Sequence, residues 1–572
     1  MKTLKRTLIL ISALATAPLA GAEPPVLRLE SLKFVGNDGT EIAAERGELR
    51  VPENRSKPDS RTLNLSFVRF KATGAKPGAP IVYLAGGPGG SGVEAARGSR
   101  LPLFLALREF GDVIAFDQRG TGLGSGDDAE SDCDERYQID FSKPLDRRGT
   151  VSALVPAFRA CLARLGKNGF DLAGYTTEES AADLEDLRRA LGAEKLTLWG
   201  ISYGTHLALA TLKAFPTSVD RVILAGIEGL DDTLKLPSDQ QELLVTLAEL
   251  ARPQVPDLLG TMREALRQLE ASPKTVSLTH PFTGEAGPIV VGALDFQAVV
   301  ADMLTGPETF AGLPDFVNRV AAGDWTALAM LAAPGRLGEV PIAMAVGMDC
   351  ASGASAERRA RIAAEAREAL LGDAINLPFP ELCDELGIRE LGAAFREPVR
   401  SAVPALLISG TLDGRTRPRQ AEALLPGLPN AVHLVIDGAG HSDPLFLSSP
   451  KILETMQAFL RGEAVGERRI VLPPVQFRPV RRLAEVPPAT LARYVGEYRV
   501  GAQGVRKVFL AGSILYTQRP GNLPFPLRPI SNDEFFYEGL AGSLRFETDA
   551  DGQVLAMWFR GADGREERCP RL

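Results

Sequence analysis

Short, continuous apolar runs separated by helical stretches recur along the first half of the chain. Between residues 62 and 67, apolar and polar side chains first alternate with the period of a half-buried strand. Beyond Ala79 the runs at 81–84, 113–116, 196–199 and 222–224 are apolar except for Thr197. Strands without polar alternation, separated by helices, indicate a parallel sheet that is covered on both faces.

This rhythm stops at residues 229–395, where helical segments dominate, and resumes with apolar runs at 405–408 and 432–435. A long helical insertion between two sheet strands predicts a cap over the carboxyl edge of the sheet, where α/β folds bind ligands. We therefore expect an α/β core at 23–228 and 396–462, with the insertion as its cap.

The end of the chain has a different pattern. Residues 463–480 contain three prolines and are expected to form a linker. An alternating segment at 544–547 and an apolar run at 554–558 flank Asp551-Gly552, which is a hairpin signal. Residues 481–572 are therefore predicted to form a small accessory β domain.

The N-terminus has the pattern of a secretory signal peptide. Three basic residues lie within the first six positions, an apolar run covers 8–20, and Ala20-Gly21-Ala22 offers small side chains for cleavage. The alternative is a membrane anchor, for which the run is short. We expect residues 1–22 to be removed and the protein to be exported, to the periplasm or beyond, without a membrane span.

Export places the five cysteines in an oxidising compartment. Local spacing favours the pairs Cys133–Cys161 and Cys350–Cys383 and leaves Cys569 free. Five reduced, half-buried thiols are the alternative, because sequence does not prove connectivity. None of the cysteines has metal-ligand spacing with a histidine, and no metal or other cofactor is expected.

The formal net charge of −8 argues against a nucleic-acid partner, which would require a basic face. The sequence leaves the oligomeric state open. Candidate chemistry therefore has to come from individual motifs rather than from bulk composition.

The strongest motif is Gly200-Ile201-Ser202-Tyr203-Gly204, which lies between a predicted strand and a predicted helix. A nucleophile elbow turns so sharply that only small residues fit two positions before and after the serine. The turn exposes the serine Oγ to substrate. The alternative is a glycine-rich loop without chemistry, but the strand and helix on either side favour Ser202 as a nucleophile.

Serine is a weak nucleophile and needs a base. Among the four histidines, His206 lies one turn beyond the elbow, His280 lies in the cap and His433 lies within a strand. His441 follows Gly438-Ala439-Gly440 on a loop after the last strand, from which it can reach Ser202. His441 is therefore the predicted base.

The acid that orients the base should follow the preceding strand, because in this type of site the chain order is serine, acid, histidine. Asp413 stands there, 28 residues before His441. It would hold the imidazole in the correct tautomer and stabilise its charged form. Asp437 and Asp443 lie closer in sequence and are interpreted as surface carboxylates.

Acyl transfer also needs two donors for the developing oxyanion. The Tyr203 N–H is one candidate. The other comes from the glycine-rich segment 85–90, where Gly87 is preferred and Gly86 is the alternative. A phosphate-binding loop is disfavoured because the segment lacks the Lys-Ser/Thr pair and contains Pro88.

Several of these motifs occur together in one known family. Gly86-Gly87-Pro88-Gly89, Asp117-Gln118-Arg119-Gly120-Thr121-Gly122, the elbow and the opening segment 47–54 resemble the proline iminopeptidase and tripeptidyl aminopeptidase family of α/β-hydrolases (peptidase family S33 type). The resemblance implies an α/β-hydrolase fold and a secreted peptidase acting on peptide N-termini, with Ser202, Asp413 and His441 as its triad.

Such a peptidase needs carboxylates in the cap to hold the ammonium group of its substrate. Related enzymes often carry acidic residues just after a cap cysteine, whereas here Asp349 precedes Cys350. Glu228 and Asp231, at the cap entrance, are the predicted substrate-binding residues, and a solvated acidic turn is the alternative.

The segment 491–498 resembles the small β domain that is appended to some β-lactamase-like serine hydrolases, which implies an accessory role. The predicted activity is a secreted serine hydrolase that releases residues from the N-terminus of short peptides. A carboxylesterase acting on small acyl esters with the same triad is the alternative.

Overall fold

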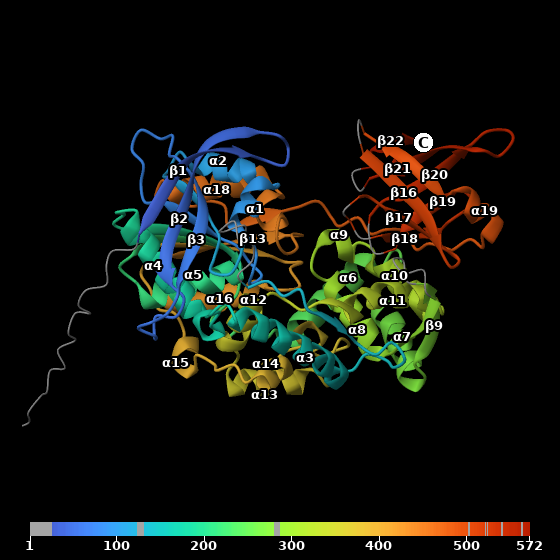
Figure 1. The fold of residues 1–572 in the computed structure, drawn as a ribbon, viewed down its shortest axis with the longest axis horizontal. Coiled ribbons are helices and arrows are strands. Elements are labelled where there is room, and N and C mark those ends of the chain that lie inside the picture. Colours follow the sequence, from blue (N-terminus) through green and yellow to red (C-terminus); the bar gives the residue numbers. More distant parts are fainter. Residues whose placement is uncertain are drawn as a thin grey trace, which may run out of the picture.

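A computed structural model of the chain describes residues 26–122, 131–279, 286–501, 504–520, 522, 524–538, 541–561 and 564–572. It contains an α/β core, a helical cap and a C-terminal β domain (Figure 1). The predicted signal peptide lies outside the described residues. Among the described helices, none is both long and apolar enough to cross a membrane.

The core is built on a ten-stranded sheet in the order β1-β2-β3-β5-β4-β7-β8-β12-β13-β14. Strands β1 to β3 are antiparallel, and every pairing from β5 through β14 is parallel. The bounds are β1 Leu27–Val35, β2 Glu41–Pro52, β3 Thr62–Phe70, β4 Ile81–Leu84, β5 Val113–Phe116, β7 Leu196–Ser202, β8 Val219–Ile227, β12 Ala405–Gly410, β13 Ala431–Asp437 and β14 Arg469–Val471. The predicted apolar runs thus form the covered parallel strands.

Strand β14 was not predicted. It lies within the expected linker and pairs in parallel with β13, where Ile470 is buried at the sheet edge. With only one apolar side chain turned inward, its three residues carry too little pattern to be recognised as a strand.

Helices cover both faces of this sheet. Along β4, Val82 and Leu84 enter one hydrophobic cluster and Ile81 and Tyr83 enter the other, because successive side chains of a strand point to opposite faces. The helices are α1 Gly92–Arg97, α2 Leu101–Leu107, α17 Pro444–Leu447 and α18 Pro450–Leu460 on the face of Ile81, and α4 Thr177–Ala190, α5 Tyr203–Ala214 and α16 Pro418–Leu424 on the other.

The segment between β8 and β12 forms the cap (green and yellow in Figure 1). Its elements are α6 Pro237–Ala251, α7 Leu258–Ala271, β9 Lys274–Thr279, β10 Ala286–Val291, α8 Ala293–Met303, α9 Pro307–Phe310, α10 Leu313–Ala321, α11 Trp325–Ala332, β11 Leu337–Glu339, α12 Ala343–Ser352, α13 Ala356–Glu365, α14 Glu381–Leu386 and α15 Ala393–Arg396. Short 3₁₀ turns occur at Leu172–Gly174, Ala333–Arg336, Ala374–Asn376 and Leu425–Gly427.

An earlier part of the chain also joins the cap. Strand β6 (Arg136–Gln138) pairs with β11, and α3 (Arg147–Gly166) packs against α12 and α14. The side chains of Cys161 on α3 and Cys350 on α12 share one hydrophobic cluster. The cap is therefore assembled from two separate stretches of sequence.

Both predicted disulfides are formed, Cys133–Cys161 and Cys350–Cys383, and Cys569 is free and buried. The first links the start of the β6 segment to α3, and the second links α12 to α14. Both bonds lie in the part of the chain that forms the cap.

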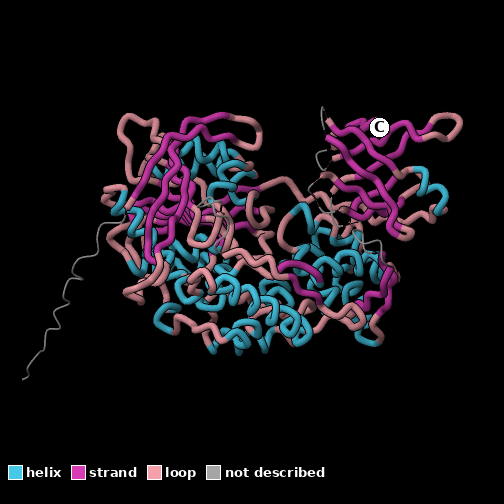
Figure 2. The backbone as a smooth tube through the Cα atoms, in the orientation of Figure 1, coloured by secondary structure: helices cyan, strands magenta, loops and turns pink. Residues whose placement is uncertain are grey.

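The C-terminal domain is an eight-stranded antiparallel sheet in the order β15 to β22, preceded by α19 (Pro488–Arg493). It is rich in strands, whereas the cap beside it is mostly helical (Figure 2). A bridge between Tyr498 and Arg571 brings the first and last strands together as a near-barrel. The strands are β15 Gly496–Val500, β16 Gly504–Ala511, β17 Ile514–Gln518, β18 Phe525–Pro529, β19 Glu534–Tyr537, β20 Ser543–Thr548, β21 Val554–Arg560 and β22 Glu566–Pro570. The predicted hairpin is β20–β21.

Candidate active site

Ser202 ends β7 and directly precedes α5, with φ 53° and ψ −126°. This conformation is rare for a residue with a side chain and defines a sharp turn. A Cβ at Gly200 would lie 2.6 Å from the Gly204 carbonyl oxygen, and one at Gly204 would lie 2.0 Å from the Leu84 carbonyl oxygen. Both glycines are therefore required by the close backbone approach, as expected for an elbow.

The structure brings Asp413 and His441 together. Asp413, which follows β12, is fully buried, and its Oδ2 lies 2.8 Å from His441 Nδ1. Thr416 donates to the same carboxylate from its backbone N–H at 2.8 Å and from its Oγ1 at 2.7 Å. Burial alone would raise the pKa of Asp413, but the adjacent His441 and the Thr416 hydrogen bonds outweigh it and lower this pKa. The carboxyl group is therefore held in its charged form.

Space for His441 beside the elbow is left by Gly226, near the end of β8. A Cβ on Gly226 would lie 3.2 Å from His441 Cε1, and the residue has φ +59°. The next residue, Ile227, pairs with Ser202 in the β7–β8 register. Ser202 and His441 therefore lie at the same carboxyl edge of the sheet.

The cap covers this edge. The His441 N–H lies 3.3 Å from the Thr305 carbonyl oxygen of the cap, to which it donates. On the other side of the elbow, Ile342 of the cap lies so close to Gly89 that an added Cβ would meet it at 2.6 Å. The predicted insertion thus contacts both the histidine loop and the glycine-rich loop.

The glycine-rich loop passes directly over Ser202. A Cβ on Gly86 would lie 2.9 Å from Ser202 Cβ, and Gly87 has φ +124°. Both candidate oxyanion glycines therefore lie within reach of the serine, and Gly87 also lines the cavity described below.

The Asp117-Gln118-Arg119-Gly120 segment supports this loop. Gln118 donates to the Ala85 carbonyl oxygen at 3.0 Å, and Asp117 accepts hydrogen bonds from the Ser91 hydroxyl and the Val93 N–H. These contacts hold the glycine-rich loop in place.

A cavity of about 240 Å³ extends from Gly87 into the cap. Its charged lining residues are Glu228, Lys235, Asp349, Arg359 and Arg415. Glu228 is 6% exposed and pairs with Lys235, whose Nζ lies 2.5 Å from Glu228 Oε2. Glu228, one of the two predicted substrate-binding residues, thus lines the cavity.

Asp349 is a second carboxyl group in this cavity. Among the described residues it has no hydrogen-bond partner, and it is partly exposed. Its removal from bulk water, reinforced by Glu228, raises its pKa well above the usual value. Asp349 is not among the predicted substrate-binding residues, and its only sequence signal is its position beside Cys350.

Asp231 is placed elsewhere. Its carboxylate accepts hydrogen bonds from the Ser355 N–H and hydroxyl, both at 2.6 Å, and it is not among the residues that line the cavity. Both carboxylate oxygens bind Ser355, the residue directly before α13. Asp231 and Glu228 therefore do not lie in the same site.

The other candidate groups have separate partners. His206 is buried, which lowers its pKa, and its ring nitrogens contact the Gly229 carbonyl oxygen and the Ser352 hydroxyl. His433 contacts the Ser409 hydroxyl at 3.0 Å, and His280 lies outside the described residues. The rival carboxylates bind arginines, Asp437 with Arg469 and Asp443 with Arg100.

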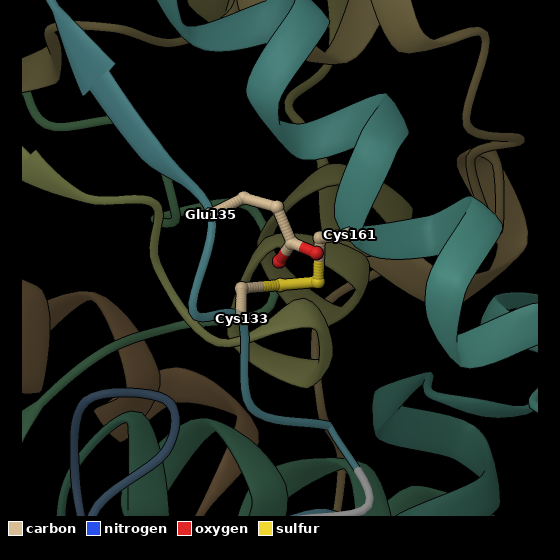
Figure 3. Close-up of side chains that lie close together, drawn as sticks. All are labelled: Cys133, Glu135 and Cys161. Atoms are coloured by element: carbon tan, nitrogen blue, oxygen red, sulfur yellow. A yellow bond between two sulfur atoms is a disulfide. The ribbon is translucent and has the colours of Figure 1, made fainter.

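One group of potential metal ligands occurs among the described residues, Cys133, Glu135 and Cys161 (Figure 3). Its two sulfur atoms are bonded to each other, and the Glu135 carboxylate pairs with Arg164 at 2.8 Å. Disulfide sulfurs are not thiolates, which are the ligand form of cysteine. This group is therefore a structural disulfide.

Comparison with known proteins gives the same picture of the core. The family model described as "alpha/beta hydrolase fold" matches residues 79–446. Serine protease Hip1 of Mycobacterium tuberculosis is 36% identical over 189 residues, 32% of this chain and 35% of that protein. Tripeptidyl aminopeptidase of Streptomyces coelicolor is 30% identical over 191 residues, 32% of this chain and 34% of that protein.

A third relative is carboxylesterase B of Mycobacterium tuberculosis, which is 32% identical over 235 residues, 37% of this chain and 44% of that protein. The chain therefore matches about a third of the length of the first two relatives, and less than half of the third.

Proposed function

We propose that this chain, which belongs to the alpha/beta hydrolase fold family, is an exported serine peptidase that releases residues from the N-terminus of short peptides. The observation that carries the proposal is the pair of carboxyl groups, Glu228 and Asp349, in a cavity that begins at Gly87. The similarity to a serine protease and a tripeptidyl aminopeptidase supports the same reading. The signal-like N-terminus and the two disulfides support export.

In this proposal Ser202 Oγ attacks the carbonyl carbon of the scissile amide while His441 accepts the hydroxyl proton. Asp413 orients the imidazole through Nδ1 and stabilises its charged form. The N–H groups of Gly87 and Tyr203 donate to the oxyanion. Collapse of the tetrahedral intermediate breaks the C–N bond, and His441 returns the proton to the departing amine. Water then hydrolyses the acyl-enzyme by the same steps.

The free ammonium group of the substrate binds between Glu228 and Asp349. Glu228 is paired with Lys235, and the Asp349 carboxyl group has no hydrogen-bond donor among the described residues. An arriving ammonium group donates to Asp349 and shares Glu228 with Lys235. Because it brings a positive charge next to Asp349, it favours the ionised form of that carboxyl group.

Glu228→Gln tests this arrangement. Each substrate is prepared as a free-amine peptide amide and as its N-acetylated form. The substitution should raise KM for the free-amine form by about tenfold, since a hydrogen bond to a charged group contributes about 1.5 kcal/mol. It should spare the acetylated form. Asp231→Asn is the matched control, because Asp231 lies outside the cavity. Equal effects of Glu228→Gln on both forms would exclude the ammonium role.

The second candidate function is a carboxylesterase, favoured by the similarity to carboxylesterase B. The same nucleophile, base and oxyanion donors would act on small acyl esters. The same panel separates the two functions when short acyl esters are added. A peptidase should cleave free-amine peptide amides with the highest kcat/KM. An esterase should have its highest kcat/KM on the esters, and its kcat/KM should not depend on whether the amine is free.

A further inference from the structure

Arg415 lies at the junction of the catalytic loop, the cavity and the cap. It stands two residues after Asp413, and its own backbone N–H donates to Asp413 Oδ1 at 2.8 Å. Its side chain lines the cavity that contains Gly87, Glu228 and Asp349. The main chain of Arg415 is therefore hydrogen-bonded to the carboxylate that contacts His441, and the same residue lines the cavity.

The guanidinium group of Arg415 is only weakly satisfied by the described residues. Its contacts are the Thr305 hydroxyl at 3.3 Å and Asp302 at 3.6 Å, and the Asp302 side chain is 82% exposed. A guanidinium group has five N–H donors in a rigid fork that matches a carboxylate. The remaining donors have no partner among the described residues, and the side chain is 34% exposed.

The other two cations of the cavity are already neutralised. Lys235 is paired with Glu228 and also donates to the Asp232 carbonyl oxygen at 2.8 Å. Arg359 binds the Glu390 carboxylate and the Ala354 carbonyl oxygen. Among the described residues that line the cavity, Arg415 is thus the cation whose carboxylate contact is the weakest, a 3.6 Å pair with the exposed Asp302. Asp349 is the carboxyl group among them with no cation in direct contact.

We propose that Arg415 forms a carboxylate-binding subsite, and that the preferred substrates of this cavity carry a negatively charged carboxylate in addition to their free ammonium group. The inference rests on the proposed function, because it names the substrate class of the same site. The carboxylate has two sources in a short peptide. It is either an acidic side chain within the released residues or the free C-terminus of the peptide.

The test uses substrate pairs that differ only in one carboxylate. Peptide amides with Glu or Gln in the released part probe the side-chain source, and tetrapeptides with a free or amidated C-terminus probe the terminal source. Aryl hemisuccinate and aryl butyrate esters form a third pair that needs no amine. The wild-type protein should prefer the carboxylate member of a pair by about tenfold in kcat/KM, equivalent to about 1.4 kcal/mol.

Arg415→Gln should abolish this preference by lowering kcat/KM for the carboxylate member of each pair. Arg415→Lys should keep part of it, because the charge remains and the bidentate fork is lost. Arg419→Gln is the control, since Arg419 is a partly exposed arginine that pairs with Asp239 and Glu242 and does not line the cavity. It should leave the preference unchanged.

A wild-type ratio near one in all three pairs would overturn the proposal, and so would a ratio that Arg415→Gln leaves intact. These outcomes are separate from failure of the proposed function. If the protein cleaves esters but no peptide, the peptidase assignment fails, and the hemisuccinate-to-butyrate ratio still decides the role of Arg415.

Discussion

Arg319, on α10 of the cap, is the central residue of a buried charge cluster that holds the C-terminal β domain on the cap. It is 5% exposed and donates two hydrogen bonds to Glu538 of the β domain, at 2.7 and 3.2 Å. On its own side it binds Asp324 at 2.6 Å and Asp315 at 3.3 Å. Figure 1 shows the β domain beside α10 and α11. Glu538→Gln keeps the shape of the side chain and removes its charge.

The expected cost follows from these contacts. Removing one partner of a buried ion pair destabilises by about 3–5 kcal/mol, because the remaining charge is left buried without compensation. Arg319 retains two carboxylates, so we expect the lower end of this range, about 3 kcal/mol, for separation of the domain from the cap. Each factor of ten corresponds to about 1.4 kcal/mol, which gives an increase of roughly 100-fold in the undocked population.

Limited proteolysis measures this population, because residues 472–487 connect β14 of the core to α19 of the β domain, and the rate of cleavage follows the open fraction when closing is fast. Trypsin should cut this segment about 100-fold faster in Glu538→Gln than in the wild-type protein. The double variant with Arg319→Met should be less destabilised than the sum of the single variants. Glu264→Gln, in an exposed pair with Arg267, is the control and should not change the rate. Equal cleavage rates in the wild type and Glu538→Gln would refute the reasoning.

Three other outcomes are expected. Ser202→Ala should abolish labelling by a fluorophosphonate probe, and persistent labelling would exclude Ser202 as the nucleophile. Thr416→Val should lower kcat about tenfold with little change in KM, because Asp413 loses one hydrogen bond to its charged form; unchanged turnover would contradict this role. Burial and the nearby Glu228 raise the pKa of the Asp349 carboxyl group in the folded protein above its ordinary value of 3.8. As the pH rises above 3.8, the unfolded chain therefore loses this proton before the folded protein does, and the free energy of unfolding falls. Asp349→Asn should therefore raise the melting temperature near pH 7 but not near pH 3, and an equal effect at both would refute the shift.

Much of the core could be predicted because its signals are local. A covered parallel strand is apolar at successive positions, and the elbow requires glycine on both sides of Ser202 within one turn of chain. Asp413 and His441 could be predicted because each follows a predicted parallel strand. The loops at the ends of neighbouring parallel strands meet at one edge of the sheet. Their contact at 2.8 Å agrees with that argument.

Where an element depends on a distant partner, the local pattern was insufficient. Strand β14 lies in the predicted linker, because only its pairing with β13 makes it a strand. No local pattern places α3 in the cap, because its position depends on contacts with α12 and α14. The β domain was recognised from a hairpin signal, but its attachment through Arg319 and Glu538 joins residues with no sequence relationship.

For the site, the sequence alone determined which residues are the candidates for attack, proton acceptance and oxyanion stabilisation, because these roles require particular side chains at the ends of strands. Only the tertiary structure decided which charges share the cavity. It placed Glu228, Asp349 and Arg415 there and directed Asp231 to the start of α13. The physical reason is that a charge is neutralised by whichever group lies within a few ångströms, and the folding of the cap over the sheet sets those distances.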